Sequence, residues 1–299
     1  YYEAQYIQQH IDFSLIEGTS NIQVVSKLET LTLNDYNYVY EWLDDGKVIL
    51  SNEQPLNANN ILEIPYTVQP KGELQLTVYA KLPKATAWAD AGFVVAKKQF
   101  VLHPYSFNRL DEEGKAPVVE KLDSLIRVTT DSHQLLFDAQ NGALIEWRYK
   151  GTNCLQGVLE PYFWKPPNEN QRRNGYVTRL GDWRLAAQHR SLDSVITVTK
   201  KGLTTLTFYL QLPVGAFYTL TYTINGAGSI QVEAIYTPTA ENIPQLPKFG
   251  MRMKLPASMN NVEWYGRGPF ENYPDRKQAA FFGHYTMGVD TFKTDYVVP

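Results

Sequence analysis

The densest group of chemically capable side chains lies in the stretch Trp264–Arg276, which reads Trp-Tyr-Gly-Arg-Gly-Pro-Phe-Glu-Asn-Tyr-Pro-Asp-Arg. Its two carboxylates, Glu271 and Asp275, belong to a residue type that general acid–base catalysis uses. The same carboxylates could instead pair with Arg276 or with backbone amides and lock the loop. Two prolines restrict the backbone here, so we expect a stiff loop that serves as a ligand rim or as a polar clamp between sheets.

Aromatic residues in the same stretch offer a second kind of chemistry. Trp264, Tyr265 and Tyr273 present flat apolar faces, which can stack on sugar rings or fill a sandwich core. The five histidines are scattered, and His284, the nearest to the stretch, has no partner at a catalytic spacing. Cys154 is the single cysteine, and no cluster of residues has metal-ligand spacing.

Composition excludes several classes of partner. With 28 basic and 31 acidic residues, the net charge of -3 gives no electrostatic case for a nucleic acid or an anionic membrane. No apolar run approaches the roughly 20 residues of a membrane span. A length of 299 residues favours two domains, each able to bury its own core.

Alternating apolar residues predict short strands through the first third of the chain. The pattern favours a strand over residues 5–17 and further strands at 22–33, 38–43, 48–50, 61–64, 74–79 and 92–102. Asp45-Gly46 is a hairpin signal between two of these strands. Seven or so strands within about 100 residues are typical of an immunoglobulin-like sandwich.

A polar, proline-containing connector at 104–121 separates this first domain, residues 1–103, from a second series of strands in 122–299. Asn141-Gly142 predicts a hairpin, and four long alternating segments over 192–236 predict a large antiparallel sandwich. Residues 180–188 form the one stretch compatible with a helix.

The motif at Trp264–Arg276 resembles the G-x-GP-x-ENY-x-DR signature in the C-terminal domain of the large β-galactosidases of glycoside hydrolase family 2. Residues 85–92, Ala-Thr-Ala-Trp-Ala-Asp-Ala-Gly, resemble a segment of the domain that follows the barrel in the same enzymes. Residues 294–299 resemble the start of the next family segment, which normally continues into Gln-Glu-Asn-Gly. The resemblance therefore covers almost the whole chain in the expected order.

The resemblance implies an all-β fold: an immunoglobulin-like β-sandwich followed by a galactose-mutarotase-like supersandwich that is incomplete at its C-terminus. It also implies that the intact enzyme hydrolyses terminal β-D-galactosides with retention, as in lactose catabolism, through two glutamates on a TIM barrel. This chain has no strand–helix alternation of that size, so we expect it to hold no catalytic residue and to be inactive alone. Its expected partners are the barrel and N-terminal domains, within a homo-oligomer.

The Mg²⁺ and Na⁺ ions of such enzymes are implied for the barrel, and no cofactor is expected in this chain. The sequence does not determine the cellular compartment of the enzyme. We expect a soluble enzyme of the cytoplasm or the periplasm. The motif residues are candidates for a wall of the sugar pocket or for a loop clamp: Trp264, Tyr265, Gly266, Gly268, Pro269, Glu271, Asn272, Tyr273, Asp275 and Arg276. Two alternatives remain, a free-standing carbohydrate-binding module and a purely structural or oligomerisation domain pair.

Overall fold

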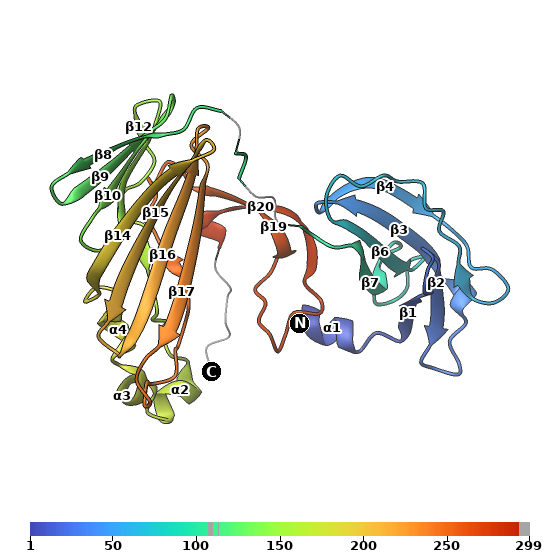
Figure 1. The fold of residues 1–299 in the computed structure, drawn as a ribbon. Helices are drawn as coiled ribbons and strands as arrows, with labels where there is room; N and C mark the ends of the chain where they lie inside the picture. Colours follow the sequence, from blue (N-terminus) through green and yellow to red (C-terminus); the bar gives the residue numbers. More distant parts are fainter. Residues whose placement is uncertain (107–109, 113, 293–299) are drawn as a thin grey trace. The chain divides into compact units, whose positions relative to one another are not determined.

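The computed structural model describes residues 1–106, 110–112 and 114–292, so the family segment expected at 294–299 lies outside the described residues. The described residues form two units with separate cores. The first unit combines the described part of 1–107 with that of 260–299, and the second comprises the described part of 108–259. Each unit is built from antiparallel sheets, which confirms the predicted all-β class (Figure 1).

The first unit is a sandwich of a three-stranded and a four-stranded sheet, with strand orders β1-β2-β5 and β4-β3-β6-β7. The three-stranded sheet contains β1 (Ile11–Leu15), β2 (Ile22–Ser26) and β5 (Ile61–Leu62). The four-stranded sheet contains β3 (Asn37–Asp44), β4 (Lys47–Glu53), β6 (Leu74–Lys81) and β7 (Val94–His103). A 3₁₀ turn, η1 (Leu33–Asp35), precedes β3. Alternate residues of β3 and β6 fill the core, as the period of two predicts.

The beginning of this unit differs from the prediction, because residues 5–7 belong to a helix, α1 (Tyr2–Ile7), and not to a strand. The side chains of Tyr2 and Tyr6 are four residues apart and so share one helical face. The Tyr2 ring stacks on Phe270 at a centroid distance of 4.6 Å, and the Tyr6 ring meets Phe281 edge-on at 6.0 Å. These contacts lie more than 260 residues away in the chain, so local periodicity could not reveal the helix.

The second unit is also a sandwich, and its larger sheets have the orders β12-β11-β10-β9-β8 and β14-β15-β16-β17. The five-stranded sheet contains β8 (Val118–Leu122), β9 (Leu125–Thr129), β10 (His133–Asp138), β11 (Leu144–Tyr149) and β12 (Thr152–Asn153). The four-stranded sheet contains β14 (Ser191–Lys200), β15 (Leu203–Leu212), β16 (Ala216–Asn225) and β17 (Ile230–Pro238). Phe137, Phe208 and Tyr222 pack together between the two sheets, which confirms the predicted antiparallel run.

Smaller elements complete the second unit. A two-stranded sheet joins β13 (Glu160–Pro161) to β18 (Met251–Arg252). Three short helices lie at one end of the β14–β17 sheet (Figure 1): α2 (Glu169–Arg173), α3 (Tyr176–Leu180) and α4 (Trp183–Ala186). The helix expected within 180–188 is present as α4, whereas α2 and α3 were not predicted. Among the described residues, no helix has the length and apolar character needed to cross a bilayer.

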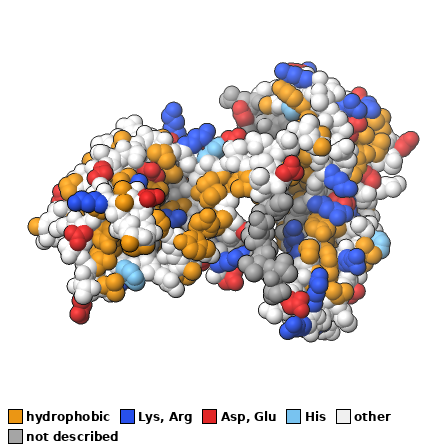
Figure 2. All heavy atoms as spheres, turned by 180° about the vertical axis from the view of Figure 1, so that it is seen from behind, with side chains coloured by type: hydrophobic (Ala, Val, Ile, Leu, Met, Phe, Trp, Pro, Cys, Tyr) orange, Lys and Arg blue, Asp and Glu red, His pale blue; other side chains and the backbone are white. Residues whose placement is uncertain are grey.

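The connector predicted at 104–121 is shorter than expected, because Val118–Leu122 forms β8 and pairs with β9. The compact units also divide the chain differently from the predicted domains, since the described part of 260–299 belongs to the first unit. This division is based on contacts within each unit and does not test the predicted domain bounds, 1–103 and 122–299, which stay a prediction. On the face shown in Figure 2, charged side chains of both signs are interspersed with hydrophobic ones.

Candidate functional site

The motif Trp264–Arg276 lies within one hairpin of the first unit. Strands β19 (Asn261–Gly268) and β20 (Phe281–Gly288) pair along their whole length, and η2 (Val289–Thr291) follows. The loop between the strands contains Pro269, Glu271, Asn272, Tyr273, Asp275 and Arg276, while Trp264, Tyr265, Gly266 and Gly268 lie on β19. All ten predicted site residues thus belong to a single supersecondary element.

The loop is locked by the groups that the sequence suggested for this role. Glu271 forms an ion pair with Arg276 at 3.0 Å and accepts a hydrogen bond from the Tyr273 hydroxyl. Tyr273 and Arg276 exchange two backbone hydrogen bonds of 3.1 and 2.9 Å, and the Arg276 guanidinium lies over the Tyr273 ring. Asp275 occupies the exposed turn between them. The structure pairs Glu271 with Arg276, so this carboxylate is engaged within its own loop.

The three aromatic residues suggested as a stacking platform are separated by the strand geometry. Adjacent residues of a strand point to opposite faces, so Trp264 and Tyr265 cannot share one surface. Trp264 packs on Tyr285, whereas Tyr265 lies on the other face, near Phe282. Tyr273 is exposed in the loop. Of the three rings, only Trp264 lines the cavity described below.

Tyr265 connects the hairpin to the four-stranded sheet. Its hydroxyl donates to the Glu73 carboxylate and accepts a 2.9 Å hydrogen bond from Gln75 Nε2. Both partners are buried, at 7% and 0% exposure. Burial, followed by the hydrogen bond to Glu73, raises the pKa of Tyr265, so its hydroxyl remains a proton donor.

Two further side chains hold the hairpin through its backbone. The Gln99 amide pairs with Phe282 in both directions: Nε2 donates to the carbonyl at 2.8 Å, and Oε1 accepts from the N–H at 2.7 Å. Glu3 of α1 accepts hydrogen bonds from the N–H groups of Gln278 and Ala279 at 3.1 and 3.0 Å. Sequence analysis missed these positioning residues, since no local pattern links residues about 180 to 280 positions apart.

Gly268, in the Gly-x-Gly-Pro part of the motif, has a steric role. A Cβ atom added there would lie 2.9 Å from the Tyr285 ring and 3.0 Å from the Trp264 ring. Both rings are half-buried. Glycine at this position therefore allows the two aromatic residues to close over the strand.

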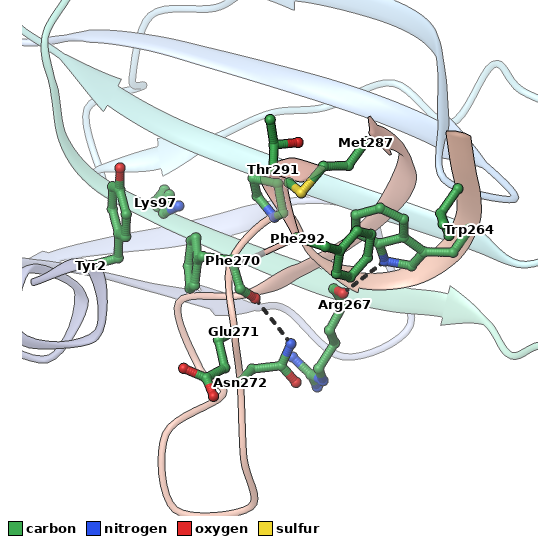
Figure 3. Close-up of a pocket in the computed structure, with 12 residues that line it drawn as sticks. Tyr2, Lys97, Trp264, Arg267, Phe270, Glu271, Asn272, Met287, Thr291 and Phe292 are labelled. Carbon is green, nitrogen blue, oxygen red and sulfur yellow. Dashed lines mark hydrogen bonds between the residues drawn. The ribbon is translucent and has the colours of Figure 1, made fainter. Parts of the chain in front are cut away.

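A cavity of about 1000 Å³ opens beside the hairpin. Figure 3 shows it between the motif loop, the start of α1 at Tyr2 and the segment after β20. Its lining residues are Tyr2, Lys97, Val262, Trp264, Arg267, Pro269, Phe270, Glu271, Asn272, Met287, Thr291 and Phe292. The volume is at the upper end of the roughly 300–1,000 Å³ range typical of ligand pockets. Glu271 and Asn272 of the predicted site reach it together with Trp264 and Pro269.

Several of the ionisable side chains of the hairpin are engaged in pairs. A retaining glycosidase uses two carboxylates about 5–5.5 Å apart, whereas Glu271 is already engaged by Arg276 and Tyr273. His284 Nε2 lies 2.9 Å from Glu263 Oε1 across the hairpin. Across residues 1–106, 110–112 and 114–292, no group of three or more His, Cys, Asp or Glu side chains could hold a metal ion. Beside these paired side chains, the hairpin borders the cavity, which is lined in part by aromatic rings.

Comparison with known proteins agrees with the motif. Residues 129–299 match the family described as "Beta galactosidase small chain", and residues 22–103 match "Beta-galactosidase, domain 4". A β-galactosidase of Vibrio vulnificus is 30% identical over a 336-residue alignment that covers 99% of this chain and 31% of the relative.

Two other similar proteins give the same result. A β-galactosidase of Lactobacillus delbrueckii subsp. bulgaricus is 30% identical, with 89% of this chain and 27% of the relative covered. One from Priestia megaterium is 28% identical, with the same coverage of 89% and 27%. The chain thus spans about a third or less of the length of these relatives. Because the first of the two family matches covers more than half of its residues, the chain belongs to the β-galactosidase small-chain family.

Proposed function

We propose that the chain is the C-terminal, non-catalytic portion of a family 2 β-galactosidase that hydrolyses terminal β-D-galactosides with retention. The observation that carries this proposal is the order of the two matches, with β-galactosidase domain 4 at 22–103 followed by the small chain at 129–299. Hydrolysis is assigned to a TIM barrel in the remainder of such an enzyme. The loop lock at Glu271 and Arg276 supports a structural role for the motif.

Within that enzyme, the hairpin is proposed to shape a wall beside the sugar pocket. A wall must hold its shape against solvent and ligand, and this hairpin is held by Gln99, Glu3 and Tyr265 as well as by its own loop lock. The Mg²⁺ and Na⁺ ions are proposed for the barrel, as the resemblance to this family implies. No catalytic step is assigned to a metal here.

The test is hydrolysis of a chromogenic β-galactoside by this chain alone and after mixing with the separately expressed remainder of a β-galactosidase. We expect no turnover by either part and recovery of turnover on mixing. An unrelated β-sandwich protein added in place of this chain serves as the control and should restore nothing. Turnover by this chain alone would overturn the proposal, because it would require a catalytic carboxylate pair within these sandwiches.

A carbohydrate-binding module is the second candidate, favoured by the aromatic cavity beside Trp264. Measurable galactoside binding by the chain would support it. A structural or oligomerisation role is the third, favoured by exposed hydrophobic side chains on the outer face of the β14–β17 sheet. These are Ile196, Tyr209, Phe217 and Ile235, with exposures of 49%, 40%, 47% and 51%. Self-association without sugar binding would favour that role.

A further inference from the structure

Lys97 of β7 lies on the face of its strand that meets the β19–β20 hairpin. Its Nζ atom donates a 3.4 Å hydrogen bond to the Ala279 carbonyl and lies 4.6 Å from the centroid of the Phe281 ring. The half-buried side chain lines the cavity of about 1000 Å³ beside the hairpin, and Figure 3 draws it among the lining residues. An amine at the wall of a cavity can meet a small molecule that enters the cavity.

The neighbouring lysine of the same strand has a different environment. Lys98 points to the opposite face of β7, because adjacent residues of a strand alternate. Its Nζ atom forms an ion pair with the Asp12 carboxylate at 3.2 Å. Lys97, in contrast, forms no ion pair with a carboxylate within residues 1–106, 110–112 and 114–292. A carbonyl dipole and an aromatic ring hold its amine in place, and neither carries a full negative charge.

The acidic side chains around this face of β7 are engaged elsewhere. Tyr79 lies opposite Lys97 in the β6–β7 ladder, and its hydroxyl donates a 2.9 Å hydrogen bond to the Glu41 carboxylate. Glu3 of α1 accepts hydrogen bonds from the backbone N–H groups of residues 278 and 279. Burial therefore acts on Lys97 without a compensating charge and lowers the pKa of its amine.

A lysine in this setting has nucleophilic chemistry available. A lower pKa leaves a larger share of the amine neutral at a given pH, and the neutral amine carries the lone pair that attacks a carbonyl carbon. Desolvated lysines in apolar pockets form Schiff bases by this route. The apolar ring of Phe281 and the position of Lys97 at the cavity wall meet both conditions.

The cavity wall also indicates which carbonyl compounds would fit. Tyr2 and Phe270 stack at a centroid distance of 4.6 Å with their planes 12° apart, and Trp264 lines the same cavity. Tyr2 is 55% exposed, so part of its ring remains open to a further contact. Aromatic side chains favour offset-stacked or edge-to-face contact with another ring. The wall therefore suits an aldehyde with an aromatic body.

We propose that Lys97 is a covalent modification site at which a small aromatic aldehyde enters the cavity and forms a Schiff base with Nζ. The amine lone pair attacks the carbonyl carbon to form the C–N bond, and the carbonyl oxygen takes up a proton. Loss of one water molecule then breaks the C–O bond and leaves C=N. The step consumes no oxidant or reductant. It goes beyond the proposed function and does not depend on it.

The test is labelling of the chain with 4-fluorobenzaldehyde in the presence of cyanoborohydride, which reduces the imine to a stable secondary amine. Peptide mass spectrometry locates the product and measures its rate of formation at each lysine. Lys97 should react about fivefold or more faster than Lys98, the matched control on the opposite face of the same strand. The rate at Lys97 should also saturate with aldehyde concentration, because the aldehyde binds in the cavity first. The rate at Lys98 should rise linearly.

Two further measurements separate cavity binding from reactivity alone. Tyr2→Ala should slow labelling of Lys97 by 4-fluorobenzaldehyde and leave its labelling by acetaldehyde, which has no ring, unchanged. Unfolding in urea should abolish the difference between Lys97 and Lys98, because the fold creates it. Equal rates at the two lysines in the folded chain would overturn the proposal. So would a linear dependence at Lys97, or a preference for Lys97 that persists in urea.

Discussion

Gly46 satisfies two constraints that no other residue type could satisfy together. It lies in the turn between β3 and β4 with φ +75°, a left-handed conformation that favours glycine. The β20 backbone also approaches it closely: an added Cβ would lie 2.5 Å from the Gly283 carbonyl carbon and 2.7 Å from His284 N. The His284 N–H donates to the Gly46 carbonyl at 3.1 Å. Gly46 therefore forms the turn between β3 and β4 and also allows the β20 backbone to pack closely against that turn.

We predict that Gly46→Ala destabilises the first unit more than the same change at Gly18. Gly18 has a similar φ of +72° and nothing within 4 Å of an added Cβ, so Gly18→Ala carries only the left-handed backbone cost. That cost is about 1–2 kcal/mol for a residue with a Cβ. Gly46→Ala should cost about 1–3 kcal/mol more, because the methyl group overlaps backbone atoms. Denaturant unfolding of the two variants measures the difference, and equal costs would show that the hairpin does not approach Gly46.

At the residue scale, the sequence allowed a side-chain contact to be predicted where the two residues are close in the chain. Glu271 and Arg276 are five positions apart, and their opposite charges in a proline-restricted loop made the ion pair predictable. Tyr265 and Glu73 are 192 positions apart, so no spacing rule could join them. The proposed aromatic platform failed for a local reason, because neighbouring residues of a strand point to opposite faces.

At the element scale, β6 is unusual because both of its faces are buried. Leu74, Leu76 and Val78 enter the sandwich core, while Gln75 and Thr77 on the opposite face are 0% and 1% exposed. Alternation of apolar and polar residues normally marks a strand with one face in water. Contacts from the β19–β20 hairpin account for the difference, since Gln75 bonds to Tyr265, and Gln99 bonds to both Thr77 and Phe282.

We predict that Gln99→Leu loosens this hairpin. Leucine has a similar size but leaves the Phe282 N–H and C=O without their side-chain partner. The cost is about 0.5–1.5 kcal/mol for each of these partly buried hydrogen bonds. Amide exchange at Phe282 should accelerate by at least tenfold, the equivalent of about 1.4 kcal/mol. Gln231→Leu is the matched control, as a strand glutamine that is exposed on β17. Unchanged exchange at Phe282 in Gln99→Leu would contradict the role assigned to this amide.

Most strands were predictable, and the helices were less so. The hairpin signals Asp45-Gly46 and Asn141-Gly142 both join antiparallel neighbours, because glycine permits the turn conformation that they need. Helix α2 carried a readable signal that was missed: Asn168 and Gln171 form a capping box at its start. The sequence of helix α1 carried no such local signal, because the rings that it contacts, Phe270 and Phe281, lie far away in the chain.

At the scale of the whole molecule, each unit buries its own hydrophobic core. The first core includes Leu76, Trp42 and Phe13, and the second includes Leu220 and Phe208, all at 0% exposure. The chain reaches the first unit at both of its described ends, with the second unit inserted between residues 107 and 260. The motif hairpin is therefore joined in sequence to the second unit while its contacts are with the first.

We predict that the hairpin follows the stability of the first unit. Leu76→Ala and Leu220→Ala should each cost about 2–5 kcal/mol, because both leave a cavity in a close-packed core. Amide exchange in 261–288 should accelerate in Leu76→Ala and stay unchanged in Leu220→Ala, which acts as the matched control. Faster exchange of 261–288 only in Leu220→Ala would instead show that the hairpin is stabilised with the second unit, as the predicted domain 122–299 requires. We expect faster exchange of 261–288 in Leu76→Ala because hydrogen bonds from Tyr265 to Glu73 and between Phe282 and Gln99 attach the hairpin to the first unit.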